Sequence, residues 1–235
     1  MPIAVRPLNP SITPQLGVRV QPQYLHWEVG RYIERLTFGP GGRGRGKIWV
    51  TEKEAIQHNI ILEDYYDSLI PQHGFIGSSL YAHVGQGTSE PHPFGTMAFS
   101  VASTSAKPDG EDDGILERAD GVYDVVRRRY FSSSEVGGKD ITEWGFGPTT
   151  DSSSPPLMAW ELFRNDRGQP IALRLAPTHN LKLTYAYRIT LYPITRQDII
   201  IDIIGYRKVA GSFGISPYAI RYHTENTTVY YYGIP

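Results

Sequence analysis

The chain has 235 residues, of which 40% are hydrophobic, enough to bury a substantial core. Its 23 basic and 24 acidic side chains give a formal net charge of -1, so direct binding to nucleic acid is not expected. The absence of cysteine excludes disulfides, thiolate metal sites and cysteine nucleophiles.

The composition favours β structure. The chain holds 24 glycines and 18 prolines, which form turns, and 16 tyrosines, which favour strands. It has no apolar run of the roughly 18 residues that a membrane helix needs, and its start does not have the pattern of a signal peptide. We therefore expect a mainly β protein, an antiparallel β-sandwich with one packed helix and extended N- and C-terminal segments.

Residues 1–23 are predicted to form an extended N-terminal arm. They contain five prolines and few large apolar side chains, so they cannot build a core of their own. Two interpretations remain open: a mobile tail, or an arm that lies along a neighbouring subunit.

Residues 24–207 are predicted to form the β-sandwich domain. Residues 24–38 indicate a strand pair, or one strand that bends at Gly30. The sequence GPGGRGRGK at 39–47 predicts a loop, which would carry Arg43 and Arg45 into solvent or onto an acidic partner.

The same glycine-rich segment contains part of a phosphate-binding motif. Gly41 to Lys47 matches G-x-x-x-x-G-K, but the next residue is Ile48 where a Ser or Thr would bind Mg²⁺. No nucleotide site is expected, and no cofactor is predicted.

The main helix is predicted near residues 51–70. Thr51 and Glu54 have the spacing of a capping box, and Pro71 would end the helix. The apolar positions that would form its buried stripe are Ile56, Ile60, Leu62, Tyr65, Tyr66 and Leu69.

From residue 75 onward the pattern predicts strands. The clearest is 181–192, LKLTYAYRITLY, in which apolar and polar residues alternate as in a half-buried antiparallel strand. The other expected strands are 80–84, 96–103, 121–132, 140–146, 157–165, 171–175 and 198–207.

The segment 109–120, DGEDDGILERAD, resembles a twelve-residue calcium loop. Gly114 occupies the position of the sharp turn. The candidate oxygen ligands are Asp109, Glu111, Asp113, Glu117 and Asp120. The alternative is an acidic, solvated connection between strands.

No motif for catalysis is present. The chain lacks the G-x-S-x-G and H-E-x-x-H patterns. His73, His83 and His92 lie near each other in sequence but are expected to be structural or exposed. Within the strand at 121–132, alternation places Arg128 on one face and its two arginine neighbours on the other. Those arginines are expected to be solvated and ion-paired across strands, or to contact an acidic neighbour. No enzyme is expected.

Residues 208–235 are predicted to form an aromatic C-terminal tail. Aromatic side chains favour burial, either on the chain's own sheet or on a partner. The candidate interface residues in this tail are Phe213, Tyr218, Tyr222, Tyr230, Tyr231 and Tyr232.

Several motifs occur in an order that resembles a known family. They are YAHVGQGTSEP at 81–91, ITEWGFG at 141–147, LFR at 162–164 and LTYAYRITLYP at 183–193. In this order they resemble a family of tailed-bacteriophage virion structural proteins, over roughly residues 50–195. The resemblance implies a β-rich particle component without catalytic residues.

We therefore expect a structural protein of the virion that is assembled in the host cytoplasm. It would form a homo-oligomeric ring or adaptor in the tail, baseplate or neck and join neighbouring virion proteins or fibres. Its partners would be copies of itself and other virion structural proteins. The alternative is a lectin-like sandwich that binds glycans, with Trp49, Trp144 and Trp160 as stacking candidates.

Overall fold

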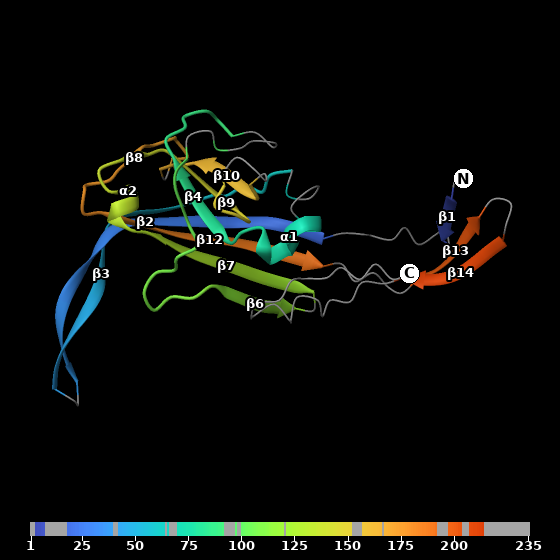
Figure 1. Ribbon diagram of the computed structural model, residues 1–235, viewed down its shortest axis with the longest axis horizontal. Coiled ribbons are helices and arrows are strands. Elements are labelled where there is room, and N and C mark those ends of the chain that lie inside the picture. The colour runs from blue at the N-terminus through green and yellow to red at the C-terminus, as the bar shows by residue number, and fades with distance from the viewer. Residues whose placement is uncertain are drawn as a thin grey trace. The chain divides into compact units, whose positions relative to one another are not determined.

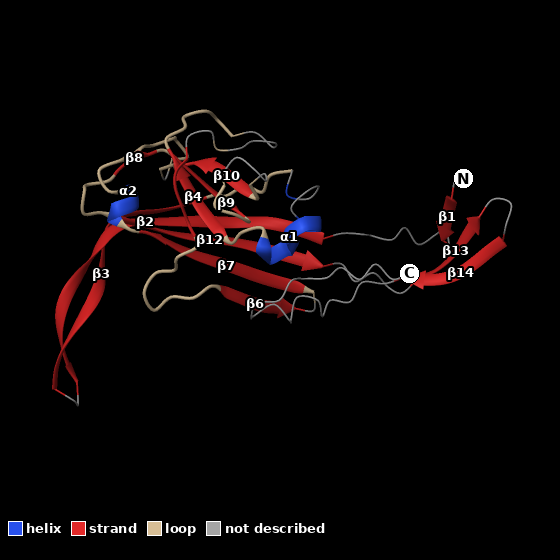
Figure 2. Cartoon of the chain, in the orientation of Figure 1, coloured by secondary structure: helices blue, strands red, loops and turns tan. Residues whose placement is uncertain are grey.

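The computed structural model describes residues 3–7, 18–39, 42–63, 65, 70–91, 97, 100–119, 121–151, 157–165, 167–191, 197–203 and 207–213 (Figure 1). Strands predominate in this part of the chain (Figure 2). They are β1 (Ile3–Pro7), β2 (Val18–Gly39), β3 (Gly42–Gln57), β4 (Tyr81–Gly85), β5 (Ser100–Thr104), β6 (Gly114–Ala119), β7 (Val122–Phe131), β8 (Asp140–Ile141), β9 (Glu143–Gly147), β10 (Ala159–Leu162), β11 (Leu173–Arg174), β12 (Asn180–Leu191), β13 (Gln197–Ile203) and β14 (Arg207–Phe213). The helices are α1 (Ile70–Gly77) and α2 (Ser133–Val136).

The expectation of a mainly β, antiparallel protein is confirmed. The strands form sheets of three, four, two and five members. Their orders are β1-β13-β14, β10-β9-β4-β5, β11-β8 and β3-β2-β12-β7-β6. The pairings β1–β13, β13–β14, β2–β3, β4–β5, β4–β9, β9–β10 and β8–β11 are all antiparallel.

The chain divides into two units. The terminal unit comprises Met1–Arg19, Glu117–Tyr123 and Ile189–Pro235, and the main unit comprises Val20–Leu116 and Asp124–Arg188. The expected continuous domain 24–207 therefore corresponds only in part to the main unit.

Within the terminal unit, both ends of the chain contribute to one sheet. Strand β13 pairs with β1 on one side and with β14 on the other. The segment Ile3–Pro7 of the expected arm is thus extended, but its strand partner belongs to its own chain. Residues 208–213 of the expected aromatic tail lie in β14, and residues 214–235 lie outside the described part.

The helix expected at 51–70 is wrong in position. Residues 51–57 continue β3, where they pair with Leu25–Gly30. Thr51 and Glu54 do not cap a helix: the Thr51 hydroxyl donates to Glu28 at 2.8 Å, and Glu54 contacts His26 at 3.0 Å. Cross-strand pairing has replaced the local capping interaction. The helix α1 begins only at Ile70, and its helical geometry is broken at Gly74, where φ is 69°.

The loop expected at 39–47 is also wrong. Strand β3 begins at Gly42, and its first residues pair with the end of β2 from Gly39 ↔ Gly42 onward. Residues 24–39 form one continuous strand, with a register shift between Val29 and Gly30 in place of a turn. The two strands together make a long hairpin (Figure 1).

In the core of the main unit, aromatic side chains from the four- and five-stranded sheets contact each other. Phe146 of β9 stacks on Tyr185 of β12, with ring centroids 4.5 Å apart, and Trp144 lies 5.9 Å from the same tyrosine ring. All three side chains are fully buried. The expected apolar face of 181–192 is confirmed, since Leu181 and Leu183 are buried as well. The strand is not half-buried as expected, because Lys182 and Ala186 on the opposite face are also buried. No described helix is long and apolar enough to cross a bilayer.

Candidate functional site

The two strongest sequence motifs meet in the four-stranded sheet. Strand β4 pairs with β9, so that Gly85 lies opposite Glu143. Beside this pair, the Thr142 backbone amide donates to the Gly85 carbonyl at 2.9 Å, and its hydroxyl donates to the Gly87 carbonyl at 2.5 Å. The segments VGQG and ITEWGFG are therefore one structural feature, although 55 residues separate Gly87 from Thr142.

The buried carboxylate of Glu143 links the two segments. Glu143 is 1% exposed and accepts hydrogen bonds from the Gly87 amide and from the Trp160 indole, both at 2.8 Å. A Cβ atom at position 87 would lie 2.6 Å from the carboxylate, so only glycine fits there. Because both carboxylate oxygens are bonded inside the fold, Glu143 fixes the glycine loop to the sheet.

His83 lies on β4, the strand that ends at Gly85, and is fully buried. Burial lowers its pKa to about 4, although a backbone hydrogen bond with Thr149 and the charge of Asp151 act in the opposite direction. Its Nδ1 lies 2.7 Å from the Ser103 hydroxyl. The ring is therefore neutral at neutral pH. Of the other two histidines, His73 is half-buried in α1, and His92 lies outside the described residues.

The arginine triplet forms a buried ionic network. Alternation along β7 is confirmed, because Arg127 and Arg129 are buried and Arg128 is not. Asp113 accepts from Arg127 at 2.7 Å and from two nitrogens of Arg129 at 2.7 and 3.1 Å. The two buried arginines thus neither face solvent nor reach a neighbouring surface.

This network continues into the core. The Arg127 Nε donates to Ser79 at 3.0 Å, and the Ser79 hydroxyl lies 2.8 Å from the buried Tyr187 hydroxyl. Burial would raise the pKa of Asp113, yet hydrogen bonding to Arg129 and the charges of both arginines lower it to about 2. Asp113 is therefore ionised at neutral pH, and the network is an internal ionic brace.

The candidate calcium loop does not have the calcium-binding geometry in its described residues. Its residues 114–119 are extended in β6, where a calcium loop requires a sharp turn at Gly114. Asp113 binds arginine, and Glu111 binds Lys182 at 2.7 Å. In the described part of the chain no group of three or more His, Asp or Glu side chains is placed to hold a metal ion. Asp120 lies outside the described residues, and Glu117 is exposed on β6.

The tryptophans proposed for glycan stacking are mostly internal. Trp144 and Trp160 are 0% and 6% exposed. Trp49 is half-buried and lies edge-on to Tyr32, with centroids 5.2 Å apart, while the Lys182 ammonium sits 4.5 Å from its ring. The face of Trp49 is therefore occupied by a cation from β12.

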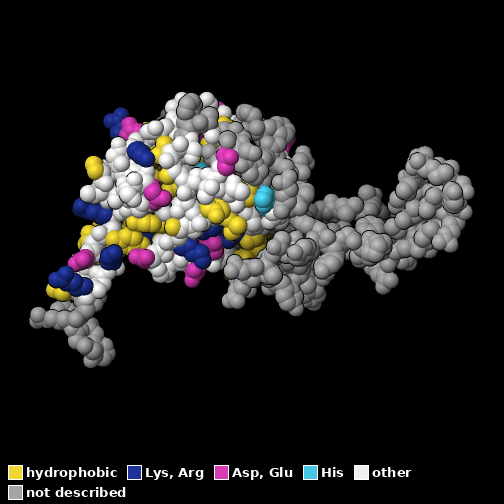
Figure 3. Space-filling view, viewed as in Figure 1, with side chains coloured by type: hydrophobic (Ala, Val, Ile, Leu, Met, Phe, Trp, Pro, Cys, Tyr) yellow, Lys and Arg dark blue, Asp and Glu magenta, His cyan; other side chains and the backbone are white. Residues whose placement is uncertain are grey.

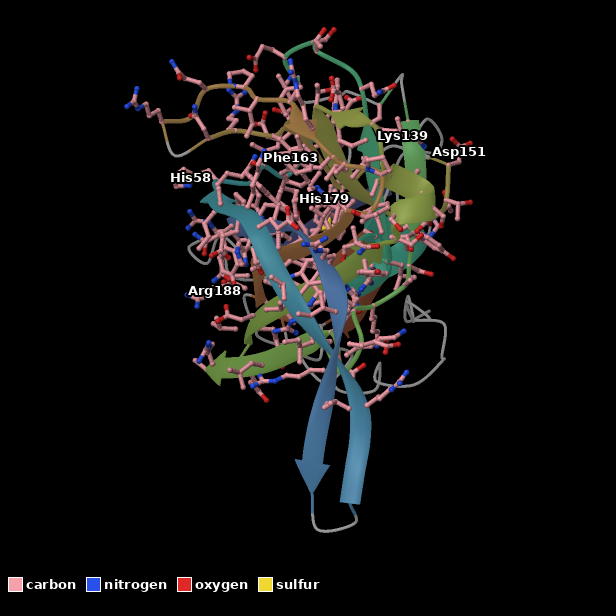
Figure 4. The ribbon with its side chains drawn as sticks, turned by 90° about the vertical axis from the view of Figure 1, so that its left-hand side faces the viewer. His58, Lys139, Asp151, Phe163, His179 and Arg188 are labelled. Carbon is pink, nitrogen blue, oxygen red and sulfur yellow. The ribbon has the colours of Figure 1, made fainter. Side chains whose placement is uncertain are left out.

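The feature that the sequence interpretation missed is the hairpin of β2 and β3. Strand β12 begins at Asn180, whose side-chain amide donates to the Gly30 carbonyl at 3.5 Å. Beyond that level the hairpin continues to Gly39 and Gly42. We call residues 31–39 and 42–50 the β2–β3 ribbon. Figures 1 and 4 both show it leaving the rest of the main unit.

The base of the ribbon is anchored by a small polar cluster. Glu52 contacts Arg31 at 3.3 Å and His179, labelled in Figure 4, at 2.8 Å. The Trp49 indole donates to Glu28 at 2.8 Å. These contacts hold the ribbon where it leaves the sheet.

The remaining interface candidates fall in several places. The side chain of Arg45 is 79% exposed on the ribbon. Arg43 and Phe213 lie in β3 and β14, but their side chains are outside the described part. Tyr218, Tyr222, Tyr230, Tyr231 and Tyr232 also lie outside the described residues. The alternation of glycine with Arg43, Arg45 and Lys47, leading into Trp49, was the signal that could have indicated a strand.

Comparison with known proteins adds no relative: no protein-family model, no curated protein and no solved structure matches this chain.

Proposed function

We propose that this chain is a structural component of a tailed-bacteriophage particle. In this proposal it assembles with copies of itself into a ring or adaptor of the tail, baseplate or neck, where it joins neighbouring virion proteins or fibres. It acts by association with protein chains, and it carries out no reaction.

The observation that carries the proposal is the sheet formed by the two chain ends. Its central strand β13, QDIIIDI, is rich in isoleucine. Among the described strands, β1 and β14 each pair on one side only. The open edge of a sheet offers backbone donors and acceptors to a strand of another chain. A three-stranded sheet of this size also gains stability from an apolar cover.

The motif residues support the same proposal in a different way. The glycine loop, Glu143 and Trp160 bond to one another in the interior. Residues with buried, mutually satisfied polar groups maintain a framework. The shared order of these motifs resembles that of tailed-bacteriophage virion structural proteins, and the resemblance implies a β-rich particle component.

For the architecture we propose a β-sandwich in the main unit. The Phe146–Tyr185 stack and the contact of Trp27 with Phe163, at 6.2 Å and 85°, support a face-to-face arrangement of the four- and five-stranded sheets.

The experiment is to measure the mass of the full chain in solution by light scattering. We expect an oligomer whose mass falls when Val209→Lys places a charge on the edge strand β14. Gln169→Lys adds the same charge at an exposed position of the main unit and should leave the mass unchanged. Circular dichroism of both variants controls for folding.

A monomeric full chain at micromolar concentration would overturn the proposal. An oligomer that tolerates both lysines equally would show that association uses another surface.

A further inference from the structure

The β2–β3 ribbon carries a local excess of positive charge, although the chain as a whole has a net charge near zero. Residues 31–47 contain five Arg or Lys side chains and one acidic side chain. The basic residues are Arg31, Arg35, Arg43, Arg45 and Lys47. Figure 3 shows basic side chains gathered on the described part of the ribbon.

At the base of the ribbon, Arg31 is paired with Glu52 at 3.3 Å. Beyond that pair, little of the charge on the described side chains is neutralised. Arg45 lies 3.5 Å from Glu34, but both side chains are exposed, at 79% and 67%. A pair in that position is screened by water and contributes little. Arg35 and Lys47 are exposed and have no ion pair among the described residues.

A hairpin with the composition of the ribbon has low intrinsic stability. An isolated two-stranded hairpin is marginally stable, and repeated glycine weakens a strand further. Here glycine occupies positions 39, 41, 42, 44 and 46. Glycine in a strand often marks a place where another backbone approaches closely. A charged, glycine-rich ribbon therefore suits a binding role better than a purely structural one.

A second copy of this chain offers little unpaired acidic charge in its most acidic described segment. Three of the four carboxylates of residues 109–113 already have a basic partner in the main unit. Asp112 bonds Lys107 at 2.9 Å, Glu111 bonds Lys182 at 2.7 Å, and Asp113 is held by two arginines. The charge of the ribbon is thus complementary to an anion from outside the chain.

We propose that the β2–β3 ribbon binds the phosphate backbone of duplex DNA. The major groove of duplex DNA admits a two-stranded β-ribbon. Residues 31–39 span about 30 Å at the usual rise of a strand, close to one turn of the duplex. Arg35, Arg45 and Lys47, whose side chains are exposed, contact phosphates and release counterions. This requires local charge on the ribbon and no net positive charge of the chain. This inference goes beyond the proposed structural function.

The test is fluorescence anisotropy with a labelled duplex of about 30 base pairs, titrated with the full chain at several salt concentrations. The wild type should bind at low salt and lose affinity as salt rises. Arg45→Gln/Lys47→Gln should bind about tenfold more weakly at moderate salt, with a salt slope shallower by about 2. Glu34→Gln, which removes the one carboxylate of the ribbon, should bind more tightly.

The matched control is Arg167→Gln/Arg174→Gln. It removes the same charge from exposed positions of the main unit and should bind as the wild type does. Absence of duplex binding by the wild type would overturn the inference, as would an equal loss in the two double variants. A ribbon variant that lowers the mass in light scattering without changing DNA affinity would assign the ribbon to a protein contact instead. The light-scattering test of the proposed function is independent of these outcomes.

Discussion

The carboxylate of Glu143 accepts a hydrogen bond of 2.8 Å from the backbone amide of Gly87, at a position where any side chain would collide with it. The relationship joins the loop after β4 to strand β9. It explains why a glycine and a glutamate far apart in the sequence act as one structural element.

Replacement of Gly87 tests this relationship. Gly87→Ala places a Cβ within 2.6 Å of the Glu143 carboxylate, so the loop or the buried carboxylate must move. We expect the free energy of unfolding to fall by about 2 kcal/mol or more. Chemical denaturation measures this loss. The control is Gly114→Ala, whose new Cβ meets only Val126 at 3.9 Å and should change stability little.

The ionic brace in the core gives a second prediction. Asp113→Asn removes the charge that compensates the buried Arg127 and Arg129. We expect a loss of about 3–5 kcal/mol in the free energy of unfolding, because uncompensated buried cations are costly. Asp112→Asn alters the neighbouring carboxylate, whose side chain is 88% exposed, and should have little effect. Equal effects of the two substitutions would contradict the brace.

The buried His83 predicts a pH dependence of stability. Its pKa in the folded chain is about 4, below the ordinary 6.5, because burial disfavours the charged ring. The unfolded chain therefore binds this proton first, and stability falls as pH drops from about 6.5 toward 4. The full difference corresponds to about 3 kcal/mol. Denaturation at several pH values should show this slope, and His83→Gln should flatten it. A variant with the same slope as the wild type would contradict the assignment.

The base of the ribbon provides a fourth prediction. A Cβ on Gly30 would lie 2.3 Å from the Val50 carbonyl and 2.9 Å from the Trp49 ring. Gly30→Ala should therefore displace Trp49 from Lys182 and lower stability by about 1–3 kcal/mol. Near-ultraviolet circular dichroism reports the change around the indole. Unchanged spectra and stability would show that the ribbon adjusts without cost.

The sequence interpretation failed where local and long-range preferences compete. The capping box at Thr51 and Glu54 favours a helix when only neighbours in sequence are considered. In the fold, the same side chains pair with Glu28 and His26 across the hairpin, and the 64% exposure of Ile56 shows that no buried helical stripe forms. Residues 42–47 were interpreted as a loop because glycine dominates their composition, although their alternation is also compatible with a strand.

For the charged candidate sites, too, the expectation from the sequence differs from the structure. The spacing of acidic residues in 109–120 suggested a cation loop, because sequence shows ligands and not their partners. The structure supplies those partners: Lys182 binds Glu111, and two arginines bind Asp113. The net charge of the chain likewise concealed the basic ribbon.

The sequence by itself determined the class of fold and the strongest strand, since the alternation of 181–192 needs no partner to be recognised. It also determined the apolar face of β12 and the placement of Arg128 opposite Arg127 and Arg129 on β7, but not that the face with these two arginines is buried. Only the tertiary structure decided that 51–57 is strand, that Glu143 holds Gly87, and that β1 pairs with β13. The physical reason is that each of these depends on a contact between distant residues, whose free energy exceeds the weak preferences of the local sequence.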